Sequence, residues 1–82
     1  MITPVQCRMA RAAKGWGVRD LAAKAGVSFS TVTRFENGSA EPHGSTLAVI
    51  RQALEAAGVE FKPDGAVRLR DGEAAMTEAR SS

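Results

Sequence analysis

Length, composition and charge describe one small domain. The chain has 82 residues, 44% of them hydrophobic and 24% charged, with a net charge of +2, which is enough for a single modest core. No stretch reaches the ~20 apolar residues of a membrane span, no apolar run follows a basic start as in a signal peptide, and the single cysteine excludes an internal disulfide. Composition therefore predicts a cytoplasmic protein.

The first predicted helix covers residues 4–14. Thr3 offers a hydroxyl N-cap, Pro4 suits the first helical position, and Gly15 is a natural stop. The inward face stays open because alanine surrounds the helix. One stripe contains Val5, Met9, Ala12 and Trp16, and the other contains Cys7, Ala10 and the stem of Lys14. We expect Trp16 to be a core or corner residue and Cys7 to be a half-buried hydrophobe with nothing beside it to activate a thiolate.

Residues 18–37 predict two short helices joined by a tight turn. Gly26 suits the end of the first helix and the turn, and Ser28 is a good N-cap for the second. Asn37 and Gly38 tolerate the left-handed backbone that closes a helix. The apolar residues that would face the core are Leu21, Ala22 and Ala25 in the first helix, and Val32 and Phe35 in the second. Two short helices around a turn with Gly form the helix-turn-helix unit.

The outward face of the second helix follows from a rotation of about 100° per residue. With Val32 and Phe35 turned inward, the residues expected to point away from the core are Ser30, Thr33, Arg34 and Asn37, with Phe29 on the shoulder. Arg can bind guanine, Asn can bind adenine, hydroxyls can reach bases or phosphates, and an apolar group can contact the thymine methyl. This face therefore predicts a surface for the DNA major groove.

Charge is distributed unevenly along the chain. Residues 1–37 contain six basic and two acidic side chains, a net charge of +4, whereas residues 71–82 contain one basic and three acidic ones, a net charge of −2. The positive charge is thus concentrated around the two-helix unit, as a phosphate-binding surface requires.

The second half of the chain begins with a loop rich in Gly, Ser and Pro and continues with a helix over residues 45–57, which Gly58 ends. Its apolar residues recur at spacings of three and four: Leu47, Ile50, Leu54 and Ala57. The pattern then alternates over residues 59–62 and 67–70, which predicts a hairpin. Since a lone two-stranded ribbon is marginal in water, it must pack against the helices or pair with a second copy. We expect one domain over residues 1–70 and a flexible tail at 71–82.

The chain resembles the Cro/C1-type (XRE) helix-turn-helix family. The likeness rests on Arg11 and Gly15, then Leu21-Ala22, Ala25-Gly26-Val27-Ser28, Val32 and Phe35-Glu36-Asn37-Gly38. The resemblance implies a mainly α, lambda-repressor-like bundle of four helices that binds double-stranded operator DNA as a homodimer. It also implies that Val18 and Arg19 contact the phosphate backbone and that Arg11 and Glu36 form a structural ion pair. Gly17-Val18 and Phe29 depart from the family, which often has Ser-Gln and a polar base reader there.

The leading hypothesis is a dimeric, sequence-specific transcriptional regulator. Arg19, Lys24 and Arg34 would bind phosphates, while Ser28, Phe29, Ser30, Thr33 and Arg34 would select the sequence. The alternative is a protein-interaction module of the antitoxin or regulatory-partner type, which would use the hairpin or the surface around Phe29. An enzyme is not expected: the one histidine, His43, lies in a loop with no metal-ligand spacing, and no nucleophile motif or phosphate loop is present. Neither a metal nor a cofactor is expected.

Overall fold

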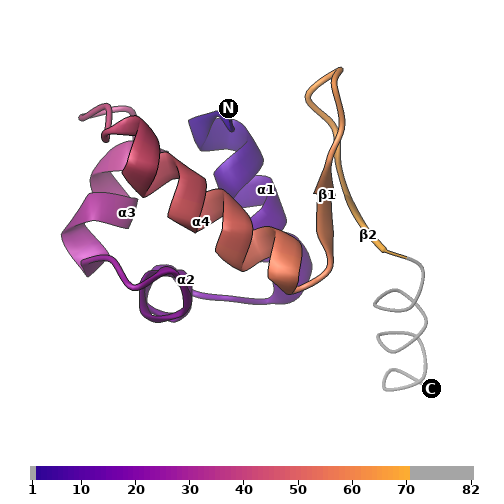
Figure 1. Ribbon diagram of the computed structural model, residues 1–82, viewed down its shortest axis with the longest axis horizontal. Helices are drawn as coiled ribbons and strands as arrows, with labels where there is room; N and C mark the ends of the chain where they lie inside the picture. Colours follow the sequence, from indigo (N-terminus) through magenta and orange to yellow (C-terminus); the bar gives the residue numbers. More distant parts are fainter. Residues whose placement is uncertain (1, 71–82) are drawn as a thin grey trace.

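The computed structural model describes residues 2–70. Four helices are followed by one antiparallel hairpin (Figure 1): α1 (Pro4–Lys14), α2 (Val18–Ala25), α3 (Phe29–Glu36), α4 (Gly44–Ala56), β1 (Val59–Phe61) and β2 (Val67–Leu69). This architecture confirms the predicted helical bundle with a C-terminal hairpin. The tail predicted at 71–82 lies outside the described residues. No described helix combines the length and the apolar character that crossing a membrane would require.

The ends of α1 are set by its own sequence. The Gln6 N–H donates to Thr3 Oγ1 (3.1 Å) and the Thr3 N–H donates to Gln6 Oε1 (2.9 Å), which is a reciprocal capping box. Gly15 closes the helix with φ 70°. The structure also decides between the two predicted stripes, because Cys7 and Ala10 are fully buried whereas Val5 and Met9 are 51% and 41% exposed. Cys7 is therefore a core residue, not the half-buried one that the sequence predicted.

The two central helices have the predicted boundaries. Gly26, at φ 71°, ends α2, and the Ser28 hydroxyl accepts a hydrogen bond from the Thr31 N–H at the start of α3. Leu21 and Ala22 of α2 and Val32 and Phe35 of α3 are buried in one cluster, to which α4 adds Leu47, Ile50 and Leu54. The helix-turn-helix unit is thus fixed on a shared core.

The hairpin packs against the helices, with β2 in contact with α1 and β1 with α4 (Figure 1). Val59 pairs with Leu69, and Phe61 pairs with Val67. Val59 is buried, and the other three side chains pack on the core cluster. Each strand ends one residue earlier than predicted. One of the two alternatives for stabilising the ribbon, packing on the helices, is therefore realised within a single chain.

Candidate nucleic-acid interface

The exposed face of α3 carries three of the predicted contact residues, since Ser30, Arg34 and Asn37 are all exposed. Val32 and Phe35, at 0% and 4% exposure, anchor the opposite face in the core. Within residues 2–70 no hydrogen bond or ion pair holds the Arg34 guanidinium. Its five N–H donors can therefore all be directed to an acceptor outside the chain.

Thr33 departs from the prediction that it points away from the core. The residue is half-buried, and its hydroxyl oxygen is buried without a hydrogen-bond partner among the described residues. Thr33 lies four residues after Phe29, so both side chains are on the same side of α3. Phe29 contacts Arg19 of α2, and this side of α3 therefore faces α2. A sequence-based helical rotation places residues relative to a helix's own apolar face but not relative to its neighbour.

Two other predicted contact residues cap α3. The Ser28 hydroxyl accepts from the Thr31 N–H (3.2 Å) and lies 2.7 Å from Thr31 Oγ1. The Asn37 carboxamide oxygen accepts from the Ser39 N–H (3.0 Å) and the Ser39 hydroxyl (2.5 Å). These contacts give Ser28 and Asn37 a structural role at the two ends of the helix. Their role in DNA binding stays a prediction.

The two basic residues of α2 lie on different sides of that helix. The Arg19 guanidinium stacks over the Phe29 ring, 4.5 Å from its centroid, next to the exposed face of α3. The Lys24 ammonium lies 5.4 Å from the centroid of the Trp16 ring, before α2 in the chain. A separation of five residues turns a helix by about 140°. The structure therefore brings Arg19 together with α3 and does not bring Lys24 there.

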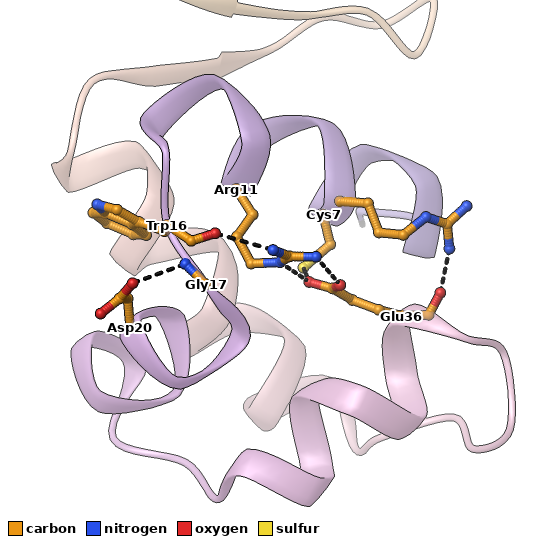
Figure 2. A network of polar contacts seen from close by, with 7 residues as sticks. Cys7, Arg11, Trp16, Gly17, Asp20 and Glu36 are labelled. Atoms are coloured by element: carbon orange, nitrogen blue, oxygen red, sulfur yellow. Dashed lines mark hydrogen bonds and ion pairs between the residues drawn. The ribbon is translucent and has the colours of Figure 1, made fainter.

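The start of α2 is capped from within. The Gly17 N–H donates to Asp20 Oδ2 at 2.7 Å (Figure 2), so the Asp20 carboxylate replaces the side-chain cap that Gly17 cannot provide. Val18 is half-buried and packs against the core. Only the backbone of Val18 is thus suited to a phosphate contact. Sequence reasoning missed Asp20, although an acidic residue at the third helical position is a known capping signal.

A buried polar network fixes the far end of α3 (Figure 2). Arg11 binds Glu36 with two hydrogen bonds of 2.8 Å, from Nε to Oε2 and from Nη2 to Oε1, and its Nη1 donates to the Trp16 carbonyl at 3.0 Å. This is the ion pair that the family resemblance implied. The side chains of Arg11 and Glu36 are 21% and 6% exposed. One guanidinium thus joins α1, the end of α3 and the loop before α2.

Two further residues complete this network. Arg8, which sequence reasoning did not single out, donates from Nη1 to the Glu36 backbone carbonyl at the end of α3. The Cys7 thiol donates to Glu36 Oε2 at 3.3 Å. Burial, and then the hydrogen bond to Glu36, raise the pKa of Cys7 to about 12. Its hydrogen bond to Glu36 raises the pKa of Arg11 as well. At neutral pH the thiol is therefore protonated and the guanidinium is charged.

His43 is exposed at the N-cap position of α4 and forms no capping hydrogen bond with its side chain. Among residues 2–70, no three His, Cys, Asp or Glu side chains come close enough to hold a metal ion. The surface that remains to be explained is the outward face of α3, together with Arg19.

Comparison with known proteins gives one match. A family model described as a helix-turn-helix domain matches residues 6–63. These residues extend from the first turns of α1 to the turn of the hairpin, so the match includes the whole network and the whole α2–α3 unit. No curated protein matches the chain.

Proposed function

The chain belongs to the helix-turn-helix domain family, and from this premise we propose that it is a sequence-specific transcriptional regulator of the Cro/C1 (XRE) type, not an enzyme, that binds operator DNA as a homodimer. The observation that carries the proposal is the outward face of α3, where exposed Ser30 and Arg34 lie opposite buried Val32 and Phe35. A rigid helix that presents short polar groups and an Arg to solvent matches the width and the hydrogen-bond pattern of the major groove.

In this mechanism α3 enters the major groove. Arg34 donates to the guanine O6 and N7 acceptors, and Ser30 reaches a neighbouring base or phosphate. Arg19 and the first backbone N–H groups of α2 bind the phosphate backbone and fix the register. The Arg11–Glu36 pair holds the end of α3 in place, so that Arg34 approaches the groove from a fixed direction.

The homodimer is supported by the small core and by two exposed apolar side chains of α1. Val5 and Met9 line a groove of about 450 Å³ whose other walls include Phe61 and Arg51. A second copy that covers this groove would remove apolar surface from water. Two α3 helices would then bind half-sites about 34 Å apart, one turn of the DNA helix.

The test is selection of bound DNA from a random-sequence pool, followed by sequencing. The expected result is a two-fold symmetric motif. Binding without any enriched motif would contradict sequence-specific regulation. Absence of salt-sensitive binding would contradict DNA binding altogether, because phosphate contacts release counterions and always depend on salt. The protein-interaction module predicted as the alternative would then be the better explanation.

A further inference from the structure

Phe29 and Arg19 form a contact that the proposed function does not explain. Phe29 is the first residue of α3, and Arg19 is the second residue of α2. The guanidinium carbon lies 4.5 Å from the centroid of the ring, a distance within the range of a cation–π contact. The contact bridges the N-terminal ends of the two helices, which is the part of a helix-turn-helix unit that approaches a phosphate backbone.

No other contact orients this guanidinium. Within residues 2–70 Arg19 takes part in no hydrogen bond or ion pair. The neighbouring carboxylate, Asp20, is occupied by the Gly17 N–H. An exposed Arg without a fixed partner samples many rotamers, and this freedom is lost when it binds. The Phe29 ring therefore determines where the Arg19 charge is held.

We propose that Phe29 is a positioning residue for Arg19. Its ring holds the guanidinium beside α3, ready to bind a DNA phosphate, and so raises affinity for all sequences without selecting a base. One face of the ring is covered by Arg19, although the side chain is 43% exposed. This inference rests on the proposed DNA-binding function, and it replaces the prediction that Phe29 contacts a thymine methyl.

The test compares Phe29→Leu, Phe29→Tyr, Arg19→Ala and the Phe29→Leu/Arg19→Ala double variant. Affinity for the selected site and for single-base variants of it is measured over a range of salt concentrations. Leu keeps an apolar side chain but has no π face, so Phe29→Leu should bind every sequence about two- to fivefold more weakly. Phe29→Tyr should bind like the wild type. Arg19→Ala should lower the slope of log K against log salt by about 0.9, and adding Phe29→Leu to it should have no further effect.

Lys24→Ala is the matched control. It also removes one positive charge from α2, but on the side that faces Trp16, and it should leave the salt slope unchanged. Circular dichroism of each variant verifies that the helices still form. If Phe29→Leu retains its full effect in the Arg19→Ala background, or changes the preference at one base pair only, the inference fails while the proposed function stands. If the wild type binds no DNA, both fail together.

Discussion

Two Arg–Glu ion pairs in different surroundings allow a comparison at the scale of single residues. Arg11–Glu36 is bidentate with Glu36 6% exposed, whereas Arg51–Glu55 lies on the surface of α4 with side chains 39% and 44% exposed. Glu36→Gln leaves the Arg11 charge poorly compensated, and we expect it to lower the free energy of unfolding by about 2–4 kcal/mol. Glu55→Gln should lower it by about 0.5 kcal/mol or less. Urea denaturation measures both, and equal losses would contradict a structural role for the Arg11–Glu36 pair.

Cys7 should make stability fall at high pH. Its pKa is raised from 9.0 to about 12 in the folded chain, so between these values the unfolded chain loses a proton that the folded chain keeps. Unfolding then becomes more favourable as pH rises. The stability due to the buried thiol is complete below about pH 9 and is lost by about pH 12. Melting temperatures of the wild type and Cys7→Ala should therefore converge or cross over this range. A constant difference between them would refute the assignment.

Arg34 provides the test of base recognition. If its guanidinium binds guanine, Arg34→Ala should lower affinity for the selected site by about 1–3 kcal/mol and relax the preference at one base pair. Arg34→Lys should keep the charge and lose most of that preference, because a lysine cannot form the bidentate contact. Competition assays with single-base variants of the site measure both effects. A loss of the same size on all sequences would show that Arg34 binds phosphate only.

At the scale of elements, the glycine that ends α2 provides a prediction with a built-in contrast. Gly26 has φ 71°, and a Cβ at this position would meet no atom within 4 Å. Gly26→Ala should therefore be destabilised by backbone strain alone, by about 1–2 kcal/mol. Gly44, the first residue of α4, has neither positive φ nor a close neighbour, so Gly44→Ala should leave stability unchanged or raise it by up to about 1 kcal/mol. Thermal denaturation of both variants would reveal whether their effects have opposite signs.

The elements were predictable where their ends are determined locally. Thr3 and Pro4 start α1, Gly15 and Gly26 end α1 and α2, and Ser28 caps α3, all as the sequence predicted. The helix faces were predictable only where one apolar stripe dominates, as in α4. The alanine-rich α1 offers two stripes, and the choice depends on Glu36, which reaches Cys7 from a distant part of the chain. No local pattern contains that information.

The same limit applies to the candidate site. Ser30 and Arg34 lie opposite the apolar stripe of α3 and are exposed, as predicted. The positions of Thr33, Arg19 and Lys24 depend on how α2 and α3 pack against each other and against Trp16. Helical rotation cannot supply this packing. The ion pair of Arg11 with Glu36 was available only through the family resemblance, because 25 residues separate its partners.

At the scale of the whole molecule, the structure changes how dimerisation should be tested. Removal of the hairpin is a poor test because Val59 is 2% exposed and belongs to the core, so the truncated chain would lose stability whether or not it dimerises. The exposed Val5 and Met9 of α1 are better targets. Both can be replaced without leaving a cavity in the core.

Val5→Lys/Met9→Lys should therefore stay folded and become monomeric, because two charges in the groove of each copy would have to be desolvated and would repel their counterparts. Val49→Lys is the control, since Val49 is also exposed, at 36%, but belongs to α4. Sedimentation equilibrium over a range of concentrations measures the state of association. A monomeric double variant should also bind the two half-sites independently, with a lower affinity for the complete symmetric site. A dimer that is unchanged by both lysines would locate the interface away from α1, and the outer edges of the two strands would be the next surface to test.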